Sequence, residues 1–491
     1  MFRRRSGFLM GATLALAAIP ALNGIASAAP SVPQLSGPIA APDIPGASSH
    51  NYIFFASNHD LATNGYVEEE YFIRGAASIY DTPDGKTGTV RQSGIPYLTR
   101  IVVRRPADPR RFNGTAIVEW DNVSNYFDAE NVWFYDWEDM MRSGYVWVGV
   151  SPQTVGVAAL RKWNARRYGQ LNVGKSDSVG PAADPKAPDR DAESFDIFTQ
   201  VGAALKHPGA VDPLGGLKPR IFLATGESQS AGRLATYVNS VHPLARVYDG
   251  FLLLSAGTPI RTDLISPVFK IMAEHDIITS GAATRQPDTD KYRSWEVTGA
   301  SHVDAHLRES REPLELRDNV TSTEAALAPQ CPYPQLGTRV HTDYAVAAAF
   351  SHLAKWAAGG AAPPKAPQIR VTRVNMAPTD SEVARDEDNI AVGGIREVPV
   401  AVPTGTNVGV GKLGLSKSTA RGESIGPTGC IRWGYSADFS PEELDQRYPS
   451  HSIYVAKVKA ATSDLIRKGF ILPADAATTV RMAEESRVGG P

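Results

Sequence analysis

The pentapeptide Gly-Glu-Ser-Gln-Ser at residues 226–230 constrains the fold more than any other part of this 491-residue chain. An apolar run precedes it at residues 221–224, and residues 231–235 can begin a helix. A buried strand, a tight turn and a helix in this order predict a serine presented above the end of a parallel sheet. The alternative interpretation is an ordinary turn in which Ser228 is a helix N-cap.

A histidine follows the serine at the end of a later predicted strand. Residues 291–297 predict that strand, and a short turn connects it to His302. A serine hydroxyl is a weak nucleophile at neutral pH, so a base must take its proton during attack and return it to the leaving group. We therefore predict that Ser228 is the nucleophile and His302 the base.

The acid of such a triad is predicted between the serine and the histidine, in a turn that holds two carboxylates. Residues 267–273 predict a buried strand that runs into this turn, which contains Glu274 and Asp276. A buried carboxylate holds the imidazole in the required tautomer and stabilises its protonated form. We favour Asp276, which lies beyond the strand, and keep Glu274 as the alternative acid.

The oxyanion that forms on an acyl substrate needs two N–H donors. One is the amide of Gln229, the residue after the serine. The other is expected in the loop after residues 114–120, where we favour the amide of Asn122 or Val123. Either of these two residues could instead belong to an ordinary Asx turn.

Five segments of the chain resemble a family of secreted bacterial α/β-hydrolase-domain proteins of the esterase kind. They are VEWDNVS at 118–124, GVSPQ at 149–153, GESQSAGRL at 226–234, RQPD at 285–288 and GGIR at 393–396. The resemblance implies an α/β-hydrolase fold with Ser228 as nucleophile, Asp276 or Glu274 as acid and His302 as base. It also accounts for Ser230, since Gly-x-Ser-Gln-Ser is the family pattern. Finally, it implies a hydrolase that cleaves carboxylic esters through an acyl-enzyme.

A serine triad serves acyl transfer in general, so other functions stay open. A peptidase or an acyltransferase on the same fold is one alternative, and a catalytically inactive binding protein is another. We expect a small-molecule or polymeric ester as substrate, and no cofactor or metal. The glycine pattern at residues 409–414 lacks a surrounding βαβ unit, and His302 and His306 lack a third metal ligand at a suitable spacing.

Composition agrees with an enzyme rather than a nucleic-acid-binding protein. A chain with 42% hydrophobic and 21% charged residues can bury a sizeable core. Its formal net charge is −2, and beyond residues 3–5 the basic residues form no cluster larger than short pairs such as those at 104–105 and 110–111. A stripe of cations that could follow a phosphate backbone is missing from the sequence, so no nucleic-acid partner is predicted.

The first residues predict export. Arginines at residues 3–5, an apolar run at 8–19 and Ala-Ser-Ala at 26–28 are typical of a signal peptide over residues 1–28. We expect a secreted or periplasmic protein with no stable membrane span after cleavage. In an oxidising compartment, the only two cysteines, Cys331 and Cys430, are expected to form a disulfide.

The remaining pattern predicts three parts after the signal peptide. Residues 29–105 form a leader and N-terminal β strands, 106–360 the catalytic core, and 361–491 a C-terminal extension that packs on the core. Alternating strand and helix patterns in the core predict a mostly parallel central sheet with antiparallel leading strands. Within the extension, residues 397–402 favour a β strand.

Overall fold

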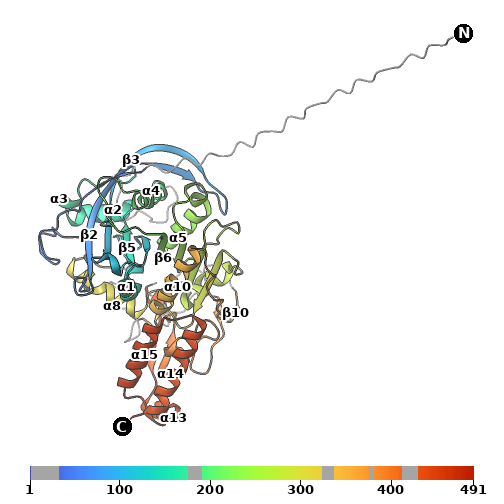
Figure 1. The fold of residues 1–491 in the computed structure, drawn as a ribbon. Coiled ribbons are helices and arrows are strands. Elements are labelled where there is room, and N and C mark those ends of the chain that lie inside the picture. Colours follow the sequence, from blue (N-terminus) through green and yellow to red (C-terminus); the bar gives the residue numbers. More distant parts are fainter. Residues whose placement is uncertain (2–31, 175–190, 323–336, 375–380, 412–428, 491) are drawn as a thin grey trace, which may run out of the picture.

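A nine-stranded sheet runs through the centre of the molecule (Figure 1). The computed structural model describes residues 1, 32–174, 191–322, 337–374, 381–411 and 429–490, so all but Met1 of the predicted signal peptide lies outside the described residues. The strands are β1 Gln34–Ser36, β2 Tyr66–Asp81, β3 Thr89–Pro106, β4 Thr115–Trp120, β5 Val146–Val150, β6 Ile221–Glu227, β7 Gly250–Leu254, β8 Val268–Ala273 and β9 Tyr292–Val297.

The sheet has the order β1-β2-β3-β5-β4-β6-β7-β8-β9. The pairs β1-β2, β2-β3 and β3-β5 are antiparallel. The remaining pairs, from β5-β4 along the sheet to β8-β9, are parallel. Every residue of β4, β7 and β8 is buried, as expected for parallel strands covered on both faces. The predicted fold class, a mostly parallel sheet with antiparallel leading strands, is confirmed.

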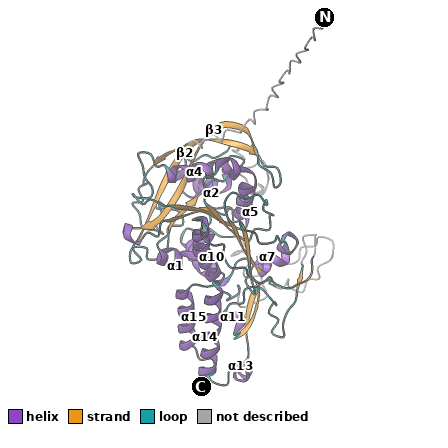
Figure 2. Ribbon diagram, turned by 45° about the vertical axis from the view of Figure 1, so that its right-hand side comes forward, coloured by secondary structure: helices purple, strands orange, loops and turns teal. Residues whose placement is uncertain are grey.

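Helices cover both faces of this sheet (Figure 2). Helices α1 and α10 contact one face, and α4 and α5 the other. The bounds in this part of the chain are α1 Asn131–Ser143, α2 Thr154–Trp163, α3 Ala165–Tyr168, α4 Ser194–Lys206, α5 Gln229–Thr236, α6 His242–Ala245, α7 Glu274–Thr279, α8 Ala305–Arg317 and α10 Thr342–Ala357. In the described parts of the chain, no helix is both long and apolar enough to cross a bilayer.

Two buried arginines of β3 hold the loop between β4 and α1. Arg100 lies 3.1 Å from Glu70 of β2 and 3.9 Å from Asp128 of the loop. Arg104 lies 2.5 Å from Glu130, the residue that precedes α1. Removing one partner of a buried ion pair costs about 3–5 kcal/mol because it leaves a charge unpaired in the interior. The antiparallel strands therefore fix the loop that contains Asn122 and Val123, the two candidates for the second oxyanion donor.

The chain after α10 returns to the sheet and then forms a helical pair. Its elements are β10 Val371–Arg373, β11 Glu382–Val383, α11 Val398–Ala401, β12 Gly405–Val408, α12 Gly429–Trp433, β13 Tyr435–Asp438, α13 Pro441–Arg447, α14 His451–Lys468 and α15 Pro473–Glu485. Ile395 forms a single β-bridge at the outer edge of β9: its amide donates to the carbonyl of Glu296 (2.7 Å), and its carbonyl accepts from the amide of Thr298 (3.0 Å). Helices α14 and α15 pack against each other at the C-terminal end of the molecule (Figure 1).

The β strand expected at residues 397–402 is wrong. The segment forms the short helix α11, which buries Val398 and Val400. Its β-branched residues favour a strand, but Pro399 lies in the first turn, where a missing N–H and a fixed φ angle suit a helix.

Candidate active site

Ser228 occupies the sharp turn between β6 and α5. Its backbone angles are φ 55° and ψ −113°, a strained conformation that costs about 1–3 kcal/mol for a residue other than glycine. Two hydrogen bonds hold it: the amide of Ser228 donates to Leu254 of β7, and its carbonyl accepts from the amide of Gly232 (both 2.9 Å). The neighbouring elements thus impose the backbone conformation that presents the hydroxyl group.

Ser230 stabilises the same turn. Its hydroxyl group accepts a hydrogen bond from the amide of Glu227 (3.0 Å) and donates one to the carbonyl of the same residue (2.9 Å). A Cβ atom on Gly226 would lie only 3.0 Å from the Ser230 Oγ atom. A small residue is therefore required at position 226, whereas the side chain at position 230 stabilises the turn directly.

His302 follows β9 and reaches across to the serine. Its Nε2 atom lies 2.8 Å from Ser228 Oγ, and its Nδ1 atom lies 2.8 Å from Asp276 Oδ1. The Tyr135 hydroxyl group donates to the carbonyl of His302 (3.1 Å), which fixes the backbone that carries the imidazole. The structure thus brings together the three side chains that the sequence order proposes.

The two candidate acids lie in different surroundings. Asp276 Oδ2 accepts a hydrogen bond from the amide of Ala273 (2.8 Å), so its other oxygen is directed at His302. Glu274 instead accepts from the amide of Gly299 (2.9 Å) and pairs with Arg385 (2.6 Å). Of the two carboxylates, only that of Asp276 contacts the histidine, and Glu274 ties α7 to the turn after β9.

A third carboxylate approaches the histidine, and the sequence analysis did not single it out. Glu227, the last residue of β6, is 3% exposed, and its Oε1 atom lies 3.4 Å from His302 Nε2. Its Oε2 atom accepts hydrogen bonds from the side-chain amides of Asn131 (2.8 Å) and Asn122 (3.2 Å). Its position directly before the serine is the signal that could have drawn attention to it.

These charges act in opposite directions on the pKa values of the site. Burial lowers the pKa of His302, but the carboxylates of Asp276 and Glu227 outweigh it, so the pKa is raised despite a smaller lowering by Arg432. Burial raises the pKa of Asp276, but the imidazoles of His302 and His275 hold it well below its usual range. Asp276 is therefore ionised at neutral pH and stabilises a protonated His302.

The structure separates the two candidates for the second oxyanion donor. The amide of Asn122 already donates to the carbonyl of Ala129 (2.9 Å), so Asn122 is not a suitable backbone donor. The amide of Val123 makes only a long contact, 3.4 Å, to the side-chain oxygen of Gln229. The amide of Gln229 is the first in α5 and has no acceptor within the helix. Val123 and Gln229 remain as the pair of candidate donors.

A cleft of about 660 Å³ opens onto Ser228. Its wall carries the hydroxyl side chains of Thr82, Ser124, Thr236, Ser255, Thr258 and Ser280. Two cations, Arg233 and Arg432, and the ring of Phe195 complete much of the lining. The serine therefore faces a cavity that can hold a small molecule with polar substituents.

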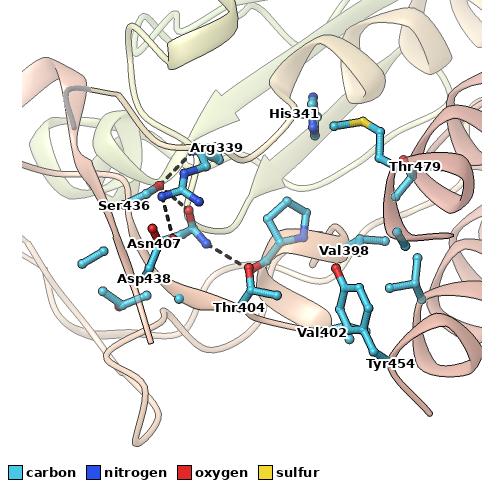
Figure 3. A pocket seen from close by; sticks show the side chains of 17 residues that line it. Arg339, His341, Val398, Val402, Thr404, Asn407, Ser436, Asp438, Tyr454 and Thr479 are labelled. Carbon is cyan, nitrogen blue, oxygen red and sulfur yellow. Dashed lines mark hydrogen bonds and ion pairs between the residues drawn. The ribbon is translucent and has the colours of Figure 1, made fainter. Parts of the chain in front are cut away.

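A second cavity, of about 220 Å³, lies in the C-terminal part of the chain (Figure 3). Val398, Val402 and Tyr454 form an apolar wall. On the polar wall, Arg339 forms an ion pair with Asp438 (2.7 Å). Its lining residues come from the segment before α10 and from the chain between α11 and α15, and include no member of the triad.

A third cavity, of about 200 Å³, is lined by acidic side chains. Asp136, Asp139 and Asp475 are buried around it, and each has a carboxylate oxygen without a hydrogen-bond donor. His306, at its wall, lies 3.5 Å from Glu138. His306 therefore belongs to this acidic cluster and not to the serine site.

The described residues contain one group of side chains that could share a metal ion: His275, Asp276 and His302, whose ligand atoms lie within 4.8 Å of one another. The contacts of Asp276 with His302 (2.8 Å) and with the neighbouring His275 (3.2 Å) already account for this proximity. Cys331 and residues 412–414 of the glycine pattern lie outside the described residues, so the disulfide stays a prediction.

A serine at a strand-to-helix turn, followed along the chain by an acid and a histidine at the ends of later strands, defines the α/β-hydrolase class. The sequence matches the α/β hydrolase domain family over residues 35–481, and the chain belongs to this family. The resemblance inferred from the sequence is thereby confirmed at the level of the family. No curated protein sequence matches the chain.

Several solved esterase structures are similar to parts of the chain. Esterase Est22 is 10% identical over 54% of this chain and 83% of its own, with a TM-score of 0.31. A fungal esterase from Rhizomucor miehei is 11% identical over 52% and 82%, with a TM-score of 0.27. The glucuronoyl esterase from Solibacter usitatus is 9% identical over 54% and 84%, with a TM-score of 0.26.

Proposed function

We propose that this protein hydrolyses carboxylic esters through an acyl-enzyme formed on Ser228. The observation that carries the proposal is the continuous pair of 2.8 Å contacts from Ser228 through His302 to Asp276. In acylation, Ser228 Oγ attacks the ester carbonyl while His302 Nε2 takes the hydroxyl proton. The same nitrogen then gives this proton to the departing alcohol, and Asp276 stabilises the imidazolium in between.

The developing oxyanion would be bound by the amides of Gln229 and Val123. In the resting site, the neutral side-chain oxygen of Gln229 lies near the amide of Val123. A negatively charged oxygen is a stronger acceptor than this neutral amide oxygen and would replace it. Deacylation repeats the sequence with water in the place of the serine hydroxyl group, which releases the acid and restores Ser228.

The substrate class and the location of the protein are parts of the same proposal. Family resemblance favours an ester, either a small molecule or an exposed group of a polymer, and the hydroxyl-rich cleft suits a polar one. We propose export through a signal peptide at residues 1–28. Mass spectrometry of protein recovered from outside the cytoplasm would reveal a chain that begins near residue 29.

Turnover of p-nitrophenyl esters of increasing acyl length tests the reaction. Ser228→Ala should lose nearly all activity and all labelling by a fluorophosphonate. Ser124→Ala, which changes another serine of the same cleft, should keep the label on Ser228. Equal turnover by the parent and Ser228→Ala would remove Ser228 as the nucleophile.

The alternative functions give different results in the same assays. A peptidase would cleave p-nitroanilide peptides in preference to esters. An acyltransferase would pass the acyl group to an added alcohol faster than to water. A binding protein would give no turnover and no covalent label at Ser228.

A further inference from the structure

Glu227 is held so that one of its oxygens faces the catalytic base. The side-chain amides of Asn131 and Asn122 both donate to Oε2, at 2.8 and 3.2 Å. Oε1 lies 3.4 Å from His302 Nε2, the nitrogen that also faces Ser228 Oγ at 2.8 Å. The carboxylate is therefore oriented by two neutral donors, and its second oxygen points to the atom that receives the proton.

The energetic effect of this carboxylate depends on the protonation state of His302. Glu227 is 3% exposed, so little water screens its charge. A neutral imidazole interacts weakly with the carboxylate, whereas an imidazolium at 3.4 Å attracts it strongly. The attraction therefore grows as the proton leaves Ser228. An interaction that is stronger in the transition state than in the ground state accelerates the reaction.

We infer that Glu227 is a second acid of this site, one that stabilises the imidazolium form of His302 from the Nε2 side while Asp276 acts from the Nδ1 side. The inference rests on the proposed function. Glu227 gains and loses no proton: the proton moves from Ser228 Oγ to Nε2 and then to the leaving alcohol. Because Glu227 acts through His302, it is a positioning and electrostatic residue.

Other charged groups also face His302, and their signs determine the test. The carboxylates of Asp276 and Glu227 raise the pKa of His302, against the opposing effect of its burial, while Arg432 lowers it. His275 lies beside the imidazole, with ring centres 5.0 Å apart, and its own pKa is lowered, chiefly by burial. Removing the charge of Glu227 alone should therefore lower the pKa of His302.

The pH profile of kcat/KM for Glu227→Gln tests the inference. Glutamine keeps the size of the side chain and can still accept from Asn131. The base must be neutral to act, so the acid limb reports the pKa of His302 in the free enzyme. We expect the limb to move to lower pH and the plateau rate to fall on the order of tenfold. The loss should shrink in acid, where the parent holds more protonated His302.

Three comparisons separate this role from a structural one. Glu138→Gln removes one negative charge from α1 beside His306 and should leave the profile unchanged. Glu227→Asp keeps the charge on a shorter side chain, so its acid limb should fall between those of the parent and Glu227→Gln. Ser228→Ala, assayed in parallel, reports separately on the proposed nucleophile.

Two results would overturn the inference without touching the proposed function. One is a kcat/KM of Glu227→Gln that is lower than that of the parent by the same factor at every pH, with no shift of the acid limb. The other is a profile identical to that of the parent. If Glu227→Gln fails to fold, the comparison of Glu227→Asp with the parent decides by the same shift. Activity that survives Ser228→Ala would instead defeat the proposed nucleophile.

Discussion

Asp276 Oδ1 lies 2.8 Å from His302 Nδ1, and the amide of Ala273 holds the other oxygen of the same carboxylate. This arrangement predicts a large catalytic loss in Asp276→Asn, because an amide at this position favours the wrong tautomer of the imidazole. We expect kcat to fall by about 10⁴-fold with little change in KM. Steady-state kinetics on a short-chain p-nitrophenyl ester measures both values.

Glu274→Gln is the matched variant of the alternative acid. Glu274 contacts Gly299 and Arg385 and no triad residue among the described contacts, so its loss should reduce stability more than kcat. Glu274 is buried but Arg385 is 23% exposed, so the loss should cost about 1–3 kcal/mol in the free energy of unfolding. A larger kcat loss in Glu274→Gln than in Asp276→Asn would reverse the assignment.

Arg432→Gln should move the acid limb of kcat/KM to higher pH. Arg432 lines the cleft, and its positive charge lowers the pKa of His302, so removing the charge lets that pKa rise. The shift is opposite in sign to the one expected for Glu227→Gln. Profiles recorded for both single variants and the double variant check this, and shifts in the same direction would contradict it.

Ser230→Ala should destabilise the protein. The alanine side chain leaves the buried amide of Glu227 without the hydroxyl acceptor that Ser230 supplies at 3.0 Å. We expect a loss of about 1–3 kcal/mol in the free energy of unfolding. Urea denaturation measures the loss, and Ser230→Thr, which retains a hydroxyl group, is the control. An unchanged midpoint in Ser230→Ala would show that this hydrogen bond contributes little.

The acidic cavity predicts stability that falls as pH rises. Burial and the neighbouring carboxylates of Asp139 and Asp475 raise the pKa of Asp136 well above its usual value, and burial raises the pKa of Asp475 to about 6. The folded state thus holds protons that the unfolded chain releases near pH 4, so stability is lost from about pH 4 through pH 6 and above.

Asp136→Asn replaces one titratable carboxyl group of this cavity with an amide that does not titrate. Its free energy of unfolding should therefore depend less on pH than that of the parent. Denaturation at about pH 5 and about pH 8 tests the difference. A variant that loses as much stability as the parent between these two values would show that Asp136 does not contribute.

The sequence order made the meeting of Ser228 and His302 predictable, since parallel strands end at one edge of a sheet and each residue follows such a strand. The acid was harder to assign, because Glu274 and Asp276 are two residues apart and only their contacts with Gly299, Arg385 and Ala273 distinguish their directions. Spacing along the chain does not encode which carboxylate faces inward.

The contributions of Glu227 and Arg432 depend on contacts between distant segments. Glu227 faces the imidazole because Asn131, far away in the sequence, binds its other oxygen. Arg432 reaches the cleft from α12, about 200 residues after Ser228, and no motif surrounds it. The strand predicted at residues 397–402 is wrong because the β-branched side chains favour a strand, whereas Pro399 lies in the first turn of the short helix α11.

The pairing of Ile395 with β9 has a further consequence. An uncovered outer strand offers its N–H and C=O groups to any passing chain, and this is a common route to aggregation. Deletion of residues 361–491 would leave the carbonyl of Glu296 and the amide of Thr298 unpaired at this outer edge. We therefore expect the truncated protein to self-associate through β9, in addition to losing Arg432 from its cleft.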